Sequence, residues 1–265
     1  MLMSMRPEAI AGFPIWAAGL LLAGGAIAGA ILIELIARRL FPSMLREEHN
    51  PVAAAIFSVI GTTYAVLLAF VAMLAWDGSN HARDITASEA SLISATYELV
   101  GGLTSAERDE LRHDLIAYAR RVAGTEWPAL AAGRDVSEQE PHLTHATQTA
   151  LRLRPDNVAD TELWTLIVSD LASLDRARQA RLHAARATIP TIVWVVLIAG
   201  GAITVAFGSF LGAPSLRMHL AMSSLLALSG ALVLLVIVAL SSPFRGDFGI
   251  TAEPFERTLT RMQAE

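Results

Sequence analysis

The sequence contains no cysteine and no lysine, so all 20 of its basic residues are arginine. Without cysteine the chain has no disulfide framework, no thiolate metal site and no cysteine nucleophile. We attribute the exclusive use of arginine to codon bias in a GC-rich genome, because no single function requires every lysine to be replaced. Charged residues make up only 17% of the chain, and its formal net charge is −5. That negative balance argues against nucleic acid as a partner.

The short motifs of the common enzyme classes are also missing. The chain has no G-x-S-x-G, no P-loop, no H-E-x-x-H and no G-x-G-x-x-G dinucleotide fingerprint. No set of nucleophile and base stands out in their place. We therefore expect no enzymatic activity and no cofactor.

Long apolar runs are what the sequence has in abundance. Of its 265 residues 54% are hydrophobic, and the mean hydropathy is +0.48, which is typical of an integral membrane protein. A bilayer core of about 30 Å needs about 20 apolar residues in a helix. Four runs meet this requirement, at about 10–37, 51–76, 188–211 and 220–240. The first is too long for a signal peptide and lacks a cleavage site.

These runs divide the chain into four parts. Residues 1–76 hold membrane helices 1 and 2, 77–187 form a polar insert, 188–242 hold membrane helices 3 and 4, and 243–265 form a polar C-terminal tail. The predicted fold is an all-α membrane protein, with four transmembrane helices and a helical-bundle insert between the second and third. Because each pair of spans crosses twice, both termini and the insert share one side.

Two junctions between membrane and insert are predicted to be helical. The second span has no charge from Pro51 to Trp76, and after Ser79 neither proline nor glycine occurs before Gly101. A single Gly78 does not end a helix, so we expect one unbroken helix there. We also expect a helix that begins at about Asp160 to enter the third span directly.

Within the insert, apolar spacing and capping signals predict further helices. Thr104 and Glu107 have the spacing of a capping box, and Ser137 with Glu140 is expected to open a shorter helix that ends near residue 153. Two stripes of apolar residues recur at helical spacing, the first of them at i, i+4, i+7 and i+11. They are Leu111, Leu115, Tyr118 and Val122, then Leu163, Ile167, Leu171 and Leu174.

The layout of paired spans, helical insert, paired spans and same-side tail resembles the bestrophins, which are pentameric anion channels. Residues 67–83, LLAFVAMLAWDGSNHAR, are similar to the segment in which bacterial bestrophins leave the pore helix. A closer resemblance, over nearly the whole chain, is to the bestrophin-like domain family of bacteria and plants. It rests on EASLISATYEL, EWPAL, ARQARLHAAR, the glycine-bearing third span and PFRGDFGITAEPF, in that order.

The bestrophin resemblance implies that the second span lines a pore. Thr62, Val66 and Phe70 match the apolar neck of those channels and lie one turn apart on one helical face, with Ser58 a turn earlier. Thr62 departs from the apolar pattern of the neck, and a single Trp76 stands where bestrophins have a tryptophan pair. The calcium-binding region of animal bestrophins has no counterpart. The alternative reading is that Val66 and Phe70 are ordinary contacts within the helix bundle.

Small residues on two spans predict close helix packing. They are Gly25 and Gly29 on the first span, and Gly200, Thr204 and Gly208 on the third. Small residues four apart let neighbouring helices approach closely. Together they offer more packing surface than one four-helix bundle needs, so we expect a homo-oligomer in the lipid bilayer, with a pentamer favoured.

An arginine cluster precedes the third span: Arg176, Arg178, Arg181 and Arg186. It is a candidate for attracting small anions or lipid phosphates. The alternative is a solvated or salt-bridged face whose partners are Asp77, Asp84 and Asp175.

Two further groups of ionisable residues have simple interpretations. Glu34 lies near the end of the first span with Arg38 one turn on, which favours an i,i+4 ion pair over an ion site. His142 and His145 are spaced i,i+3, but two ligands without a third carboxylate or cysteine at motif spacing make a poor metal site. We interpret them as surface histidines and predict no metal.

Two functions from different classes fit these observations. The chain is either a subunit of an oligomeric anion channel, or a non-conducting membrane sensor or scaffold whose helical bundle binds a partner or ligand. We expect a multi-pass protein of the bacterial inner membrane with the insert and both termini in the cytoplasm. By count, arginines near the spans favour this orientation, whereas by density Arg38 and Arg39, directly after the first span, favour the reverse. The insert side carries Arg6, Arg83, Arg176, Arg178, Arg181, Arg186, Arg245, Arg257 and Arg261; the other side carries Arg38, Arg39, Arg46 and Arg217.

Overall fold

The chain folds into two compact helical units. The computed structural model describes residues 14–40, 50–104, 107–137, 139–155, 157–209, 211 and 215–264, and every regular element among these residues is a helix. We call residues up to 78 together with 188–242 the membrane unit, and residues 79–187 with 243–265 the insert unit. The predicted fold class is confirmed: the chain is an all-α membrane protein with a helical insert between its second and third membrane helices.

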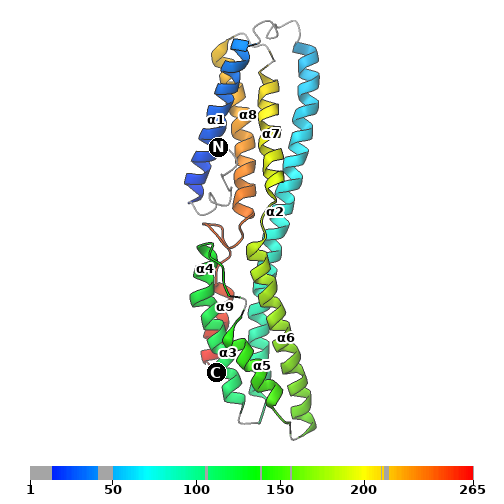
Figure 1. Cartoon of the computed structure of the whole chain (residues 1–265), viewed down its shortest axis with the longest axis vertical. Helices are drawn as coiled ribbons and strands as arrows, with labels where there is room; N and C mark the ends of the chain where they lie inside the picture. The colour runs from blue at the N-terminus through cyan, green and yellow to red at the C-terminus, as the bar shows by residue number, and fades with distance from the viewer. Residues whose placement is uncertain are drawn as a thin grey trace. The chain divides into compact units, whose positions relative to one another are not determined.

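The membrane unit contains four apolar helices that run alongside one another (Figure 1). They are α1 (Ile15–Leu40), the first part of α2 (Asn50–Gly101), α7 (Thr191–Gly208) and α8 (Leu216–Leu240). Each is long and apolar enough to span a membrane. The predicted first span began at about residue 10, and residues 10–13 lie outside the described residues, as does the loop that carries Arg46.

The insert unit is a bundle of helices around a single apolar core. Besides the second part of α2, it contains α3 (Arg108–Arg121), the π-helical turn η4 (Val122–Glu126), α4 (Trp127–Ala131), α5 (Pro141–Arg152), α6 (Val158–Arg186) and α9 (Glu253–Ala264). The first predicted stripe is buried over its whole length, and in the second only Leu163 remains partly exposed. Both stripes are therefore core-facing, as their spacing predicts.

The helix α2 is continuous from Asn50 to Gly101, a length of 52 residues, and Gly78 does not interrupt it. This confirms the predicted unbroken helix. Without proline in its interior, nothing removes an i→i−4 hydrogen bond, and one glycine costs a helix only about 1 kcal/mol. One helix therefore contributes to both units.

The second predicted junction is wrong. Helix α6 ends at Arg186, and α7 begins at Thr191 with Pro190 as its N-cap residue. Proline has no backbone N–H and disfavours the helical conformation of the residue before it, here Ile189. The two helices are therefore separate, although their hydrophobic patterns follow one another closely.

Both predicted capping arrangements differ from the structure. The hydroxyl of Thr104 donates to Oδ2 of Asp160 at 2.8 Å, and α3 begins without a side-chain cap. For α5 the N-cap residue is Glu140, whose carboxylate accepts the backbone N–H of Leu143, and not Ser137. Asp160 comes from a helix 56 residues away, so the local pattern could not reveal this competing partner.

The C-terminal tail packs into the insert unit through α9. Phe255 is fully buried, and its ring centroid lies 5.6 Å from that of Trp127. The hydroxyl of Tyr97 donates to the backbone oxygen of Met262 at 3.0 Å. The indole N–H of Trp127 donates to the backbone oxygen of Ile250 at 2.9 Å. The tail, expected as a separate polar segment, is thus part of the insert core.

Candidate functional site

One face of α2 packs into the membrane unit and the opposite face does not. Leu68, Val71 and Ala75 are each 7% exposed and join a core cluster with Trp194 and Leu197 of α7. At 100° per residue these positions lie on one side of the helix. The side chains on the other side have no partner in this core, so α2 presents a free apolar face.

The predicted pore-lining residues all lie on this free face: Ser58, Thr62, Val66 and Phe70 are exposed. Val66 is 48% exposed and Phe70 is 64% exposed. Within this chain neither side chain is buried in the helix bundle, and their pore-lining role stays a prediction. Since no charged residue occurs between Pro51 and Trp76, any barrier along this face is steric or hydrophobic.

Tyr64 fixes the rotation of α2 against α7. Its hydroxyl donates to the backbone oxygen of Leu197 at 3.0 Å. Its ring lies over two glycines of α7: a Cβ at Gly200 would be 2.8 Å from the ring, and one at Gly201 would be 2.9 Å from the hydroxyl oxygen. A hydrogen bond to helix backbone is possible only because these glycines leave the surface of α7 open. With Tyr64 held inward, Val66 and Phe70 point away.

Residues of the predicted packing faces have different surroundings. On α7, Gly200 lies against the Tyr64 ring. Thr204 is buried, and its hydroxyl donates to the backbone oxygen of Gly200 at 2.8 Å. A Cβ at Gly208 would make an ordinary contact with Phe57. In contrast, a Cβ at Gly25 or Gly29 would meet nothing within 4 Å. The small residues of α1 are thus not used at those two positions within the chain, and their packing role stays a prediction.

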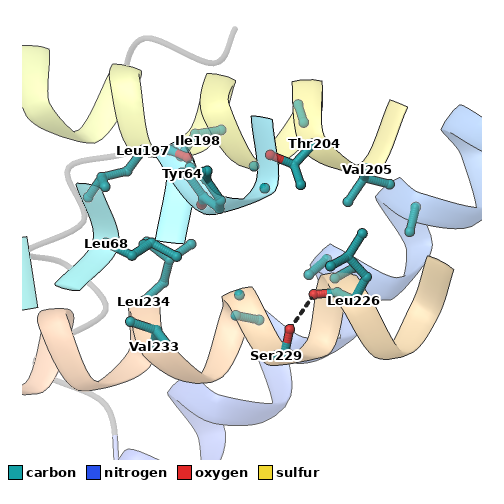
Figure 2. Close-up of a pocket in the computed structure, with 18 of the residues that line it drawn as sticks. Tyr64, Leu68, Leu197, Ile198, Thr204, Val205, Leu226, Ser229, Val233 and Leu234 are labelled. Carbon is teal, nitrogen blue, oxygen red and sulfur yellow. Dashed lines mark hydrogen bonds between the residues drawn. The ribbon is translucent and has the colours of Figure 1, made fainter. Parts of the chain in front are cut away.

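A cavity of about 690 Å³ lies among the four membrane helices (Figure 2). Its wall is almost entirely apolar, and much of it consists of glycine and alanine, which do not fill the space between helices. Larger side chains enclose it from several helices, as Figure 2 shows for Leu68, Leu197, Val205, Leu226 and Leu234. On α2 the lining includes Tyr64 and Leu68 of the packed side, and none of the four predicted pore-lining residues contributes to it.

A buried carboxylate joins two membrane helices. Glu34 of α1 is fully buried, and its Oε1 lies 2.6 Å from Nε of Arg38, so the predicted i,i+4 ion pair is confirmed. Its Oε2 lies 3.2 Å from Nε2 of His219 on α8. The spacing of Glu34 and Arg38 predicts the first contact. The contact with His219 comes from the packing of α1 on α8 and has no sequence signal.

The arginine cluster is split between core and surface. Arg178 and Arg181 are buried, at 1% and 0% exposure. Arg178 binds Oε1 of Glu126 at 2.6 Å, and Arg181 binds Oε2 of Glu89 at 2.6 Å and Oε2 of Glu126 at 2.8 Å. These two arginines do not face solvent, and the partners named here are glutamates. Anion or phosphate attraction stays a prediction for Arg176 and Arg186 alone, which are the exposed members.

Burial shapes the protonation of this network. The hydroxyl of Tyr118 donates to Oε1 of Glu89, and burial, with the nearby Glu89 charge, raises the pKa of Tyr118 well above its usual value. Burial alone lowers the pKa of Arg181, but the Glu89 carboxylate more than offsets this, so the pKa is raised. The guanidinium also lies 5.6 Å from the Trp127 ring centroid and 5.7 Å from that of Phe255. Arg181 therefore stays charged, and its guanidinium contacts α9 through the Phe255 ring.

The model of one protein family matches residues 24–255, and that family is described as the bestrophin-like domain. This match spans most of the sequence. The chain belongs to the bestrophin-like family.

Solved structures resemble the bestrophin-like chain in fold. A variant of a bacterial bestrophin homologue from Klebsiella pneumoniae is 15% identical with a TM-score of 0.68, covering 93% of this chain and 99% of that one. The Klebsiella pneumoniae homologue phased with zinc is 15% identical with a TM-score of 0.69, covering 93% and 98%. A structure described only as a membrane protein is 15% identical with a TM-score of 0.66. No curated protein matches the sequence. At this identity the likeness shows the fold alone.

Proposed function

We propose that this bestrophin-like protein is one subunit of a homo-oligomeric channel for small anions, with a pentamer favoured, and that the free face of α2 lines its pore. The observation that carries the proposal is the exposure of Val66 and Phe70 on a helix whose other side is packed. This face is left uncovered by the chain itself, so neighbouring copies can contact it or a lumen can form along it.

In a symmetric assembly the free face of α2 can line a pore, which a single subunit cannot form. The cavity within a single membrane unit is apolar, and none of the four predicted pore-lining residues contributes to it. Copies arranged around an axis instead bring their α2 faces together around a shared path, as closed rings of identical subunits do. Phe70 and Val66 then form the narrow, dewetting section, and Thr62 and Ser58 supply hydroxyls toward the other mouth.

Two observations support anions as the conducted ions: the absence of acidic side chains from this face and the resemblance to bestrophins. Cation filters commonly use rings of aspartate or glutamate. From Pro51 to Trp76 the helix carries no acidic side chain. The resemblance to bestrophins, which are anion channels, supplies the specific expectation of small anions.

A flux assay with paired variants tests the pore. The protein is reconstituted into liposomes, and halide flux is compared among the wild type, Phe70→Ala and Leu68→Ala. Removing the ring of Phe70 should widen or hydrate the constriction and raise the flux. Leu68, two residues away on the packed face, is the matched control, and its replacement should leave the flux per assembled channel unchanged. If Phe70→Ala abolished assembly and left flux unaltered in the surviving protein, α2 would not line the pore.

Subunit number and sidedness have separate tests. Native mass measurement in mild detergent should give a single oligomer, and a clean monomer at all concentrations would contradict the assembly. We place the insert and both termini in the cytoplasm of a bacterial inner membrane, on the arginine distribution. A reporter that is active only in the cytoplasm, fused after residue 265, should be active. A silent but well-expressed fusion would reverse the orientation.

The second candidate, a non-conducting sensor or scaffold, is supported by one observation. The unbroken α2 helix belongs to both units, so a ligand that displaces its second part acts on a helix that is also in the membrane. The same flux assay separates the two functions. No halide flux from wild type or Phe70→Ala, in protein shown to be assembled, would favour the sensor.

A further inference from the structure

Four ionisable side chains meet where α3 packs on α5 in the insert unit. Asp114 is 6% exposed, and its Oδ2 lies 2.7 Å from Nδ1 of His145. Its Oδ1 lies 3.7 Å from Nδ1 of His142, and Oε1 of Glu110 lies 3.5 Å from Nε2 of His145. Among the described residues, neither a hydrogen bond nor an ion pair joins Asp114 to an arginine. Both oxygens of a nearly buried carboxylate thus face imidazoles.

Helical spacing on both sides creates this arrangement. Glu110 and Asp114 are one turn apart on α3, and His142 and His145 are one turn apart on α5, so each pair lies on one helix face. The sequence shows two separate pairs, 28 or more positions apart. Only the packing of the helices adds the carboxylate that the histidine pair needs.

This donor set has the chemistry of a transition-metal site. Imidazole nitrogens and a carboxylate oxygen bind zinc at about 2.0–2.2 Å, so two such ligands in a tetrahedral site lie roughly 3.3 Å apart. The two contacts of Asp114, at 2.7 and 3.7 Å, bracket that separation. A carboxylate that accepts from the outer nitrogen of a ligating histidine is the usual second layer of such sites, and Glu110 is so placed toward Nε2 of His145.

We propose that Asp114, His142 and His145 form a binding site for one divalent first-row transition metal of the zinc class, with Glu110 orienting His145. As placed in the structure, no three His, Cys, Asp or Glu side chains among the described residues could hold a metal ion. Closing the site requires the Asp114–His145 hydrogen bond to open and the two imidazoles to rotate. Both are accessible for this, with side chains that are 38% and 50% exposed. A bound metal then joins α3 to α5.

Proton competition gives the site a characteristic pH response. A metal binds the neutral imidazole, so binding releases protons. The affinity for metal should therefore increase as the pH is raised from 6 to 8.

Metal titration of the full chain in detergent tests the proposal. The protein carries no histidine tag, is stripped with EDTA, and is titrated with Zn²⁺ against a chromophoric chelator. We expect one Zn²⁺ per chain, an affinity at least about tenfold lower for Asp114→Asn and His145→Gln, and a thermal unfolding midpoint that Zn²⁺ raises in the wild type but not in either variant. Ca²⁺ and Mg²⁺ should not compete, because imidazoles favour transition metals.

The neighbouring His113→Gln is the matched control, since His113 is an exposed histidine on the same helix. It should bind Zn²⁺ as the wild type does. Unchanged affinity in Asp114→Asn, an equal loss in His113→Gln, or no stoichiometric binding at pH 8 would overturn the proposal and leave an ordinary surface hydrogen bond. Asp114→Asn and His145→Gln are conservative, and their helicity in the absence of metal shows that any loss is not due to unfolding.

Discussion

The two units of this bestrophin-like chain differ in which side chains they bury and which they leave exposed. The insert unit closes on itself: it buries Arg181 and Glu89 completely and pairs them with each other. The membrane unit leaves Phe70 and Leu74 exposed and encloses an apolar cavity of about 690 Å³. The insert unit thus gathers its buried apolar side chains into one core, whereas the membrane unit has faces that only lipid or other copies can cover.

The physical reason is the solvent of each unit. In water, exposed apolar side chains are costly, so the insert unit gathers its stripes into one core. In a bilayer the lipid tails are as apolar as leucine, so no hydrophobic force closes the helices on one another. Exposed apolar side chains on α2 thus cost nothing in lipid, and the membrane unit can keep a face for assembly.

The largest effect should come from breaking the buried network of the insert unit. Glu89→Gln removes one charge and leaves Arg181 buried without its closest partner, which should cost about 3–5 kcal/mol of unfolding free energy. Denaturant unfolding in detergent, followed by tryptophan fluorescence, measures it. Glu253→Gln, at an exposed pair on α9, should not change stability measurably. Equal stability of Glu89→Gln and wild type would contradict the importance of the network.

On α2, Leu68 on the packed face and Phe70 on the free face allow packed and exposed positions to be compared directly. Leu68→Ala removes a side chain from the membrane core and should cost about 2–5 kcal/mol. Phe70→Ala should cost the isolated subunit far less, because its ring is 64% exposed. Thermal unfolding of detergent-solubilised variants at matched oligomeric state checks the difference. The reverse order would place Phe70 in a packed core.

Glycines offer a third contrast, within the membrane unit. Gly200→Ala places a Cβ 2.8 Å from the Tyr64 ring and should cost about 1–3 kcal/mol through overpacking. Gly25→Ala meets nothing within the chain, so subunit stability should not fall. If Gly25 packs against another copy, the same change should instead weaken assembly, which native mass measurement detects. No change in either property would exclude Gly25 from the interface.

The smallest effect concerns pH in the insert unit. Because Asp114 raises the pKa of His145 in the folded state, the charged imidazole contributes stability that is fully present below its ordinary pKa of about 6.5. This contribution is lost as the pH rises through the raised value. Unfolding midpoints in EDTA-containing buffer from pH 6 to 8.5 should therefore fall more steeply for wild type than for His145→Gln. Identical slopes would show that the hydrogen bond does not influence stability.

Sequence by itself determined the features that depend on near neighbours along the chain. Hydropathy located the four apolar spans, the absence of interior proline predicted the continuous α2, and i,i+4 spacing predicted both core stripes and the Glu34–Arg38 pair. The family resemblance and the helical spacing together selected Val66 and Phe70, and these do lie on one exposed face. Each of these inferences uses residues within a few turns of one another, where helix geometry fixes which side chains are adjacent.

Tertiary structure alone decided which distant groups meet. Arg181 is separated from Glu89 by 92 positions, and Arg178 from Glu126 by 52, so an arginine cluster that reads as a surface patch is half buried. In the same way Asp114 joins His145 from another helix. The sequence specifies which face of each helix is apolar but not which neighbour covers it. Partners of buried charges depend on that choice, because ion pairs form only after the helices pack.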